Sequence, residues 1–246
     1  MGSNILGATP LALMAAALLS IGHAHAQGSE TDATRWRGFY VGGEVGAAWS
    51  SYSWSTTPNY FNTQGPTLLG SELTAGQGGF AGGAFGGYSW IIGPAVLGLE
   101  AAVRGGSLSK SQPTPWYPAT DVATSDVHWM ASAVARAGYA WQRWQFFGKA
   151  GWAGASAGFT LTDTGTGITS TTQKWVNGWT AGLGIQYMAF DRVSVGVTWD
   201  YTDLSASGIG SSCPGCGSGV GLGTPVLDTH LRLNAVMARF TFHAGP

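Results

Sequence analysis

The stretch DRVSVGVTWDYTD, residues 191–203, alternates two kinds of side chain. Odd positions from Val193 to Tyr201 are apolar or aromatic, and even positions from Ser194 to Thr202 are small, polar or acidic. Successive side chains of a β-strand point to opposite faces, so this pattern predicts a strand with one apolar and one polar face. Soluble sandwiches and membrane barrels both contain such strands, and the rest of the chain must decide which face points inward.

The composition favours contact with lipid. Only 9% of the 246 residues are charged, whereas the chain contains 40 glycines and 12 tryptophans. Soluble domains carry about 25% charged residues, so this composition fits either a low-complexity secreted protein or a chain whose outer surface meets lipid. The 11 basic and 12 acidic residues nearly balance, so we expect no nucleic-acid partner.

The N-terminal segment has the features of a secretory signal. No charged residue occurs before Glu30, and an apolar run from Leu11 to Ile21 precedes Ala24-His25-Ala26. This pattern predicts a signal peptide over 1–26, cleaved between Ala26 and Gln27. The run is shorter than the ~20 residues of a transmembrane helix. We therefore expect a periplasmic segment over 27–37 and a barrel domain over 38–246, with no further domain after it.

Alternating segments recur eight times along the mature chain. They cover 38–49, 78–90, 96–106, 126–141, 145–159, 173–187, 193–203 and 229–242. Long connections (50–77, 107–125, 160–172 and 204–228) alternate with short ones around Gly93-Pro94, Gln142-Arg143 and 188–192. Short periplasmic turns and longer extracellular loops are typical of outer-membrane barrels. The sequence thus predicts an all-β fold, an eight-stranded antiparallel up-and-down transmembrane β-barrel in the outer membrane.

The aromatic residues sort into two predicted belts, as expected at two membrane interfaces. The belt near the short turns contains Phe39, Trp90, Tyr139, Trp141, Phe240 and Phe242. The belt near the long loops contains Trp49, Trp129, Trp175, Trp179, Trp199 and Tyr201. The alternative is that these rings form the core of a soluble sandwich, whose exposed faces would need more charge than the chain has.

Six charged residues fall on the face opposite the apolar one and are predicted to lie inside the barrel: Glu44, Glu100, Arg104, Arg136, Lys149 and Asp200. Enclosed charges must pair or stay hydrated, so a salt-bridge network is the simplest interpretation. A charged constriction that selects ions in a pore is the alternative. Eight strands leave room only for side chains, which favours the network. We expect the partner of Asp200 among the three bases.

Other candidate sites lie in or near the long connections. Cys213 and Cys216 flank a Pro-Gly pair and predict a disulfide, with free thiols, redox chemistry or metal binding as alternatives. His128 with Asp126 and Ser125, and His230 near Asp228, are the residues from which a hydrolytic triad could form. We interpret them as polar residues at strand ends and expect neither an enzyme nor a cofactor. Haem capture would need loop ligands, for which the candidates are Tyr60 and Tyr117.

Four short motifs resemble a known family. The opening strand, WRGFYVGG at 36–43, and the motifs LGLEA at 97–101, RAGYA at 136–140 and WDYTDL at 199–204 resemble the small porin-like surface antigens of Gram-negative outer membranes. These proteins are related in shape to the OmpA transmembrane domain. The resemblance implies that Glu100 and Arg136 are charges of the barrel interior.

The resemblance also implies a structural or surface-interaction role. The expected partners are outer-membrane lipid and lipopolysaccharide, the barrel-assembly machinery and an extracellular ligand held by the loops. The alternative function is a narrow diffusion channel for small solutes. Surface haem binding and lipid A modification are more remote alternatives.

Overall fold

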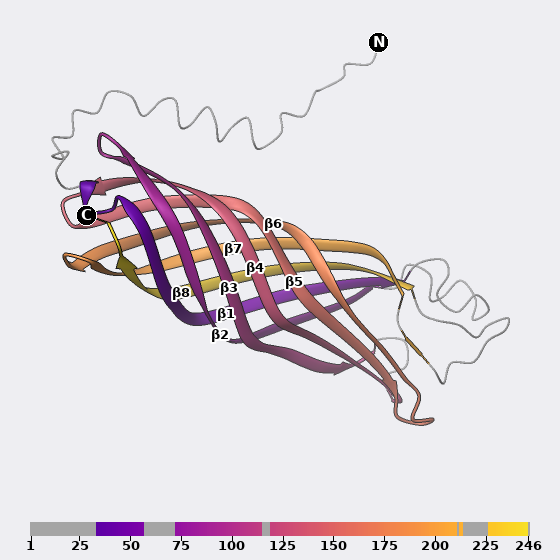
Figure 1. The fold of residues 1–246 in the computed structure, drawn as a ribbon. Coiled ribbons are helices and arrows are strands. Elements are labelled where there is room, and N and C mark those ends of the chain that lie inside the picture. The colour runs from indigo at the N-terminus through magenta and orange to yellow at the C-terminus, as the bar shows by residue number, and fades with distance from the viewer. Residues whose placement is uncertain (1–32, 57–71, 115–118, 211, 214–225, 246) are drawn as a thin grey trace, which may run out of the picture.

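The computed structural model describes residues 33–56, 72–114, 119–210, 212–213 and 226–245. Eight antiparallel strands form a closed barrel in which each strand pairs with the next and β8 pairs with β1 (Figure 1). They are β1 (Gly38–Thr56), β2 (Glu72–Ile92), β3 (Ala95–Pro113), β4 (Asp121–Trp141), β5 (Trp144–Asp163), β6 (Thr169–Phe190), β7 (Val193–Gly210) and β8 (Val226–His243). The predicted eight-stranded up-and-down fold is confirmed. Within the described ranges, no helix is long and apolar enough to cross a membrane.

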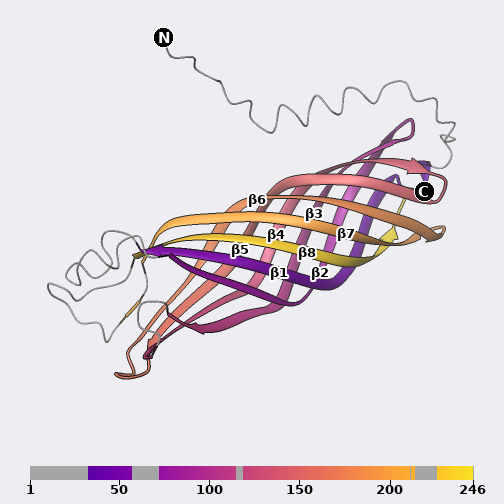
Figure 2. The same ribbon diagram turned by 180° about the vertical axis from the view of Figure 1, so that it is seen from behind.

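Three two-residue turns join strands at the end of the barrel that also carries the C terminus (Figures 1 and 2). They are Gly93-Pro94, Gln142-Arg143 and Asp191-Arg192. Left-handed backbone is common in two-residue hairpin turns, and in the first two turns Gly93 and Gln142 supply it with φ of 60° and 54°. The predicted short connections are therefore turns, and they define the inner end of the barrel.

The strands are longer than the alternating pattern predicted, between 18 and 22 residues. The prediction that 50–77, 107–125, 160–172 and 204–228 are loops was wrong over much of their length, because strand pairing continues into each of them from both sides. The segments between strands shrink to 57–71, 114–120, 164–168 and 211–225. Main-chain pairing needs no apolar side chains, so Ser- and Thr-rich segments can extend a ladder.

The connection between β5 and β6 illustrates how tight the outer end becomes. Asp163 accepts hydrogen bonds from the Thr166 hydroxyl at 2.7 Å and from the backbone N–H of Gly165 at 2.8 Å. These two donors lower the pKa of the Asp163 carboxyl below its usual value, because both favour the ionised form. A segment predicted as a thirteen-residue loop is thus a short, hydrogen-bonded turn.

The two faces of β1 exchange character near Trp49. Between the inner end of the barrel and Trp49, the residues that face outward include Phe39 and Val45, which are 69% and 60% exposed. The residues that face the barrel interior in this part include Glu44. Beyond it, Ser51 is exposed whereas Tyr52 and Trp54 are buried. No register shift separates the two parts of β1, so each face keeps its direction and changes its residue type.

The same exchange occurs on β8 and β7. On β8 the outward residues change from Phe242, Phe240 and Val236 to Arg232, while the buried residues change from Arg239 to Leu233. On β7 the outward face changes from Val197 and Trp199 to Asp203 and Ser205, while Leu204 becomes buried. The barrel therefore has an apolar exterior around a polar interior at its inner half, and a polar exterior around an apolar interior at its outer half.

Strand length agrees with this division. A strand of 18 to 22 residues spans about 60 to 75 Å, whereas crossing a membrane takes about 9–11 residues. The inner half has the apolar exterior that lipid requires, and the outer half has the exterior of a water-soluble protein. Beyond the tryptophans, the strands form an extension that stands outside the apolar band.

This outer extension is a pair of sheets. Pairing between β2 and β3 stops at Ala81–Gly106, and pairing between β6 and β7 stops at Asn177–Ser205. The other neighbouring strands stay paired to their outer ends, so β7-β8-β1-β2 and β3-β4-β5-β6 separate into two groups, which diverge in both views (Figures 1 and 2). An isolated bridge between Thr171 and Ser212 spans the β6–β7 gap.

An apolar core joins the inward faces of the two sheets, as in a β-sandwich. The ring of Trp54 lies 4.6 Å from that of Phe159, centroid to centroid, and its indole N–H donates to the Ser125 hydroxyl at 3.2 Å. The core includes Tyr52, Leu108, Val127, Val176, Leu204, Ile209, Leu231, Leu233 and Met237. These side chains pack together between the two sheets of the outer extension.

The exchange of faces predicts that one substitution has different costs on the two halves of β7. Val197→Arg should destabilise the protein by about 2–4 kcal/mol, because it places a charge on the lipid-facing surface, and Ser205→Arg by about 0–1 kcal/mol. Both sites are exposed on the same face of the strand. Urea unfolding in liposomes would measure both. Equal costs would contradict the assigned boundary.

Candidate functional site

Seven charged side chains form a layer across the barrel interior, here called the ionic layer. It consists of Glu44, Glu100, Arg104, Arg136, Lys149, Asp200 and Arg239. Alternation turns each side chain inward, and the pairing register brings residues from β1, β3, β4, β5, β7 and β8 to a common level. All are buried except Arg104, whose side chain is 11% exposed. The six charges predicted to lie inside are thus brought together.

Glu100 is the centre of the layer. Its Oε2 accepts hydrogen bonds from Arg239 at 2.7 Å, Arg136 at 2.9 Å and the Tyr40 hydroxyl at 3.1 Å. Arg136 also donates to the Tyr40 hydroxyl at 2.9 Å. One carboxylate oxygen therefore collects two guanidinium groups and a phenol, an arrangement that offsets the cost of burying the charge.

Asp200 and Glu44 are joined through Arg104. Arg104 donates to Glu44 through Nε and to Asp200 through Nη2, the latter at 2.6 Å. Lys149 lies 3.0 Å from Asp200 and 3.7 Å from Glu100. Among the three bases expected as partners of Asp200, the structure brings Arg104 and Lys149 to it and directs Arg136 to Glu100.

Arg239 is a member that the sequence analysis missed. Its Nη2 bonds Glu100, and its Nε lies 3.6 Å from Glu44. Arg239 is adjacent to the outward Phe240 on the strand, so the same alternation that predicted the other six charges to lie inside also predicts that Arg239 points inward. The layer therefore contains three acids and four bases.

Aromatic rings and glycines complete the layer. The guanidinium carbon of Arg136 lies 3.8 Å from the centroid of the Phe147 ring, and that of Arg239 lies 3.6 Å from the Phe85 centroid. Ring faces attract cations, so these contacts complement the three carboxylates. A Cβ at Gly184 would overlap the Phe147 ring, so glycine at this point makes room for the ring inside the barrel.

Apolar side chains cover the ionic layer on both sides. At the inner end, Ala33, Trp36, Val96, Ala140 and Met188 form a buried cluster, and Trp36 packs edge-on against His243 with centroids 5.3 Å apart. Residues 33–37, predicted as part of a periplasmic segment, thus place Trp36 inside the inner mouth. The sandwich core covers the outer side. Within the described residues, side chains therefore occupy the barrel axis at three levels: the inner mouth, the ionic layer and the sandwich core.

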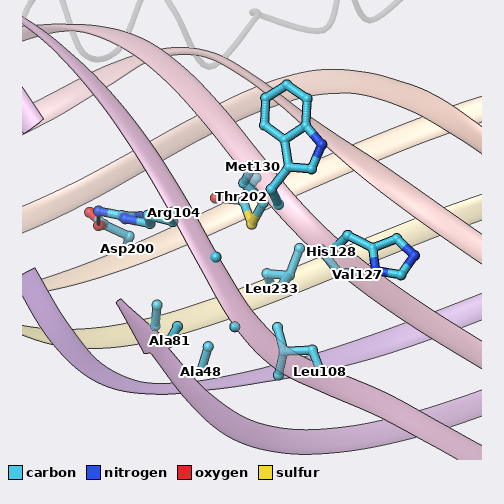
Figure 3. A pocket seen from close by; sticks show the side chains of 14 residues that line it. Ala48, Ala81, Arg104, Leu108, Val127, His128, Met130, Asp200, Thr202 and Leu233 are labelled. Atoms are coloured by element: carbon cyan, nitrogen blue, oxygen red, sulfur yellow. Dashed lines mark hydrogen bonds and ion pairs between the residues drawn. The ribbon is translucent and has the colours of Figure 1, made fainter. Parts of the chain in front are cut away.

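A small cavity remains where the ionic layer meets the sandwich core. It has a volume of about 30 Å³ and is lined by Arg104, Asp200, Ala48, Ala81, Leu108 and Leu233, among others. Figure 3 shows Arg104 and Asp200 together on one side of it, with the ring of His128 pointing away. This volume suits about one water molecule.

The predicted belt residues lie mostly on the exterior. Phe39, Trp49, Trp90, Trp129, Trp141, Trp179, Trp199, Phe240 and Phe242 are exposed, and Tyr139, Trp175 and Tyr201 are partly buried. Trp129 and Trp175 are 4.7 Å apart between centroids, and Trp152, which the sequence analysis left out, lies 6.3 Å from Trp175. Trp179 contacts Tyr201 at 5.5 Å.

The candidate triads are not assembled. The hydroxyl of Ser125 is held in the core by Trp54, whereas His128 and Asp126 form a pair at 2.7 Å on the outward face. His230 pairs with Asp203 at 2.7 Å instead of Asp228, whose carboxylate accepts the Gly208 N–H at 2.8 Å. Serine and histidine thus lie on opposite sides of the wall in the first set.

The remaining candidates are placed only in part. Cys213 is disulfide-bonded, whereas Cys216 lies outside the described residues. Tyr60 and Tyr117, the haem candidates, and the signal cleavage site at Ala26 and Gln27 also lie outside them. Within the described ranges, no group of three or more His, Cys, Asp or Glu side chains could hold a metal ion.

Comparison with known proteins gives one family and several similar proteins. A family model described as the outer membrane protein beta-barrel domain matches residues 13–223. The 31 kDa outer-membrane immunogenic proteins of Brucella melitensis biotype 1 and Brucella suis biovar 1 are each 28% identical over 177 residues, covering 70% of this chain and 73% of theirs. The outer membrane protease OmpT from Escherichia coli aligns with a TM-score of 0.51 at 9% identity, covering 83% of this chain and 96% of its own. That likeness shows the fold alone.

The ionic layer predicts unequal costs for removing two acids. Glu100→Ala should destabilise the barrel by about 3–5 kcal/mol, because it leaves buried Arg136 and Arg239 without their shared carboxylate. Asp203→Ala, which breaks partly exposed contacts with His230 and Arg232, should cost about 0–1 kcal/mol. Unfolding of both variants in liposomes checks this. A Glu100→Ala cost below that of Asp203→Ala would show that the layer does not stabilise the barrel.

Proposed function

The chain belongs to the outer membrane protein β-barrel family and lies in the outer membrane, and from that premise we propose that it is a non-conducting, non-enzymatic barrel that presents an extracellular surface. The observation that carries this proposal is the filled interior. Trp36 and its neighbours, the ionic layer and the sandwich core succeed one another along the axis. The interior of an eight-stranded barrel is only wide enough for side chains, and these three groups of side chains occupy it.

The division of the strands supports a role outside the membrane. A barrel that served only as an anchor would need about ten residues per strand, whereas these strands continue for 18 to 22 residues. The additional length builds two sheets around an apolar core with a polar exterior. We infer that this outer extension is the part that meets partners, and that the ionic layer holds the barrel beneath it in one arrangement.

The proposed partners follow from the three surfaces. Outer-membrane lipid and lipopolysaccharide would contact the apolar band and the aromatic rings at its edges. The barrel-assembly machinery would act during insertion. An extracellular ligand would bind the outer extension, whose exposed side chains include Lys110, Lys174 and Arg232. A narrow diffusion channel has weaker support, because apolar side chains cover both sides of the ionic layer.

The non-conducting role predicts the outcome of a bilayer experiment. Full-length protein in planar bilayers should show no steady conductance, because apolar side chains cover both sides of the ionic layer in the described part of the chain. Lys149→Gln removes one buried cation of the layer with little change in volume and is the matched variant. A stable wild-type conductance whose ion selectivity shifts in Lys149→Gln would overturn the proposal in favour of a channel.

The non-enzymatic role predicts unchanged lipid. The Ser125 hydroxyl lies in the core, where it accepts a hydrogen bond from the Trp54 indole, and His128 lies on the outward face. The two side chains cannot meet, so we expect no lipid A modification from this pair. Lipid A from cells with and without the protein should give identical mass spectra. A mass difference that persists in His128→Ala but not in His230→Ala would instead assign chemistry to the second histidine.

A further inference from the structure

Four arginines lie at the inner end of the barrel and form a group here called the basic rim. They are Arg35, Arg37, Arg143 and Arg192, and all four side chains are exposed. Arg143 and Arg192 belong to two of the short turns, whereas Arg35 and Arg37 belong to the segment that precedes β1 at the same end (Figures 1 and 2). Asp191 is the one acidic side chain described at this end. The inner end therefore carries an excess of positive charge.

Buried contacts hold the N-terminal pair of rim arginines in place. Trp36 lies between them in the sequence, is 1% exposed, and packs edge-on against His243 inside the inner mouth. A helical turn surrounds it, in which the N–H groups of Trp36 and Arg37 donate to the carbonyls of Ala33 and Thr34 at 3.0 and 3.1 Å. Because Trp36 is fixed inside the mouth, the arginines on either side of it stay at the rim.

Main-chain hydrogen bonds fix the order of the arginines around the mouth. The carbonyl of Arg143 accepts the N–H of Met188 at 2.8 Å, which places the turn between β4 and β5 beside the end of β6. The carbonyl of Arg192 accepts the N–H of His243 at 2.8 Å, which places the turn between β6 and β7 beside the end of β8. Arg37 directly precedes β1, the neighbour of β8. Successive arginines are thus about two strands, or roughly 10 Å, apart around the mouth.

Each of these three arginines follows an aromatic ring toward the periplasmic side. The rings are exposed, and the pairs are Arg143 with Trp144, Arg192 with Phe190, and Arg37 with Phe39. Outward aromatic rings at the edge of an apolar band lie at the interface between hydrocarbon and headgroups. An arginine one or two residues beyond such a ring is about 3 to 7 Å farther along the chain. The three guanidinium groups therefore lie at the level of the lipid headgroups.

The charge of the basic rim is not balanced within the described part of the chain. None of the ion pairs between described residues involves its four arginines. The opposite end has the reverse balance, since the described charged side chains of the outer extension are three bases and five acids: Lys110, Lys174, Arg232, Asp121, Asp126, Asp163, Asp203 and Asp228. The excess of positive charge is thus a feature of the periplasmic end.

Exposed guanidinium groups at headgroup level suit a phosphate diester. The planar guanidinium presents donors that match two oxygens of one phosphate, and it stays charged at every physiological pH. Phospholipids form the periplasmic leaflet of an outer membrane. A zwitterionic headgroup carries its own cation beside the phosphate, whereas an anionic headgroup does not. A basic group at the membrane surface therefore favours the anionic class.

We propose that the basic rim binds the headgroups of anionic phospholipids in the periplasmic leaflet. Arg37, Arg143 and Arg192 each hold one phosphate diester, and the aromatic ring next to each arginine contacts the same lipid below its headgroup. Binding at three points around the mouth fixes the depth of the barrel in the membrane. This inference goes beyond the proposed surface role, because it concerns the opposite end of the barrel.

The test is electron spin resonance on full-length protein in phosphatidylcholine liposomes that contain spin-labelled phosphatidylglycerol or, for comparison, spin-labelled phosphatidylcholine. Wild type should immobilise a larger fraction of the phosphatidylglycerol label, since each basic residue at a membrane surface favours an anionic lipid by about fivefold. A triple variant with Arg37→Gln, Arg143→Gln and Arg192→Gln should lose this difference, because glutamine keeps hydrogen-bond donors but has no charge.

Two matched triple variants serve as controls. Lysine at the same three positions keeps the charge and should keep most of the preference for phosphatidylglycerol. Lys110→Gln, Lys174→Gln and Arg232→Gln together remove three bases from the outer extension and should leave the preference unchanged. Heat-modified mobility on gels verifies that every variant is folded.

Several outcomes would overturn the proposal. Equal association of the two lipids with folded wild type would do so, as would a preference that persists in the glutamine variant of the rim. Loss of the preference in the outer triple variant alone would place the anion site on the outer extension instead. A preference that soluble glycerol phosphate abolishes would replace the lipid with a free phosphate ester.

The proposed non-conducting role is tested separately. If lipid association fails and planar bilayers show no conductance, the rim site is refuted and the non-conducting role stands. Steady conductance would refute that role whichever lipid binds the rim.

Discussion

A β-strand has two faces, and neither can change direction without a bulge or a break. This constraint governs the whole barrel, because its strands pass through two environments while keeping the same side toward the axis. On β1 the outward face must suit lipid at Val45 and water at Ser51, and the enclosed face must suit ions at Glu44 and apolar contacts at Tyr52. Because each face keeps its direction along the strand, the apolar and polar residues change from one face to the other at the boundary between the two environments.

The ionic layer and the sandwich core are two solutions to filling the same interior. Inside the apolar band, the layer fills the axis with groups that bond one another from strands on all sides, and its partners are specific. Glu100 takes Arg136 and Arg239, whereas Asp200 takes Arg104 and Lys149. Ion pairs of this kind contribute less to net stability than their number suggests, because removing each charge from water costs free energy. In the outer extension, close packing of Trp54 against Phe159 has the same filling role without charge.

The sequence was enough to predict the number of strands, their order and the direction of most side chains, because alternation is a local property. It was not enough to predict where the strands end. Beyond Trp49, the apolar residues Tyr52 and Trp54 occupy the other face among serines, so a search for outward apolar residues takes the segment for a loop. Alternation predicts that a charged side chain points inward but not its position along the barrel axis. The partner of Asp200 could therefore be limited to three bases, and only the strand register determines which of them lie at its level. The sequence also did not predict where β2 separates from β3 and β6 from β7, because the end of strand pairing does not change the periodicity of either strand.

The position of Arg239 on the last strand has a consequence for how the barrel forms. Arg239 lies directly opposite Glu44 in the pairing of β8 with β1, the two strands whose contact completes the ring, and it reaches Glu100 on β3. Until that contact forms, Glu44 and Glu100 each lack one of their cations and keep only the partners on β3, β4 and β5. A nearly complete barrel in lipid therefore carries an electrostatic penalty that joining its first and last strands removes. Closure of the hydrogen-bonded ring and neutralisation of its interior become a single cooperative event, which disfavours partly closed intermediates.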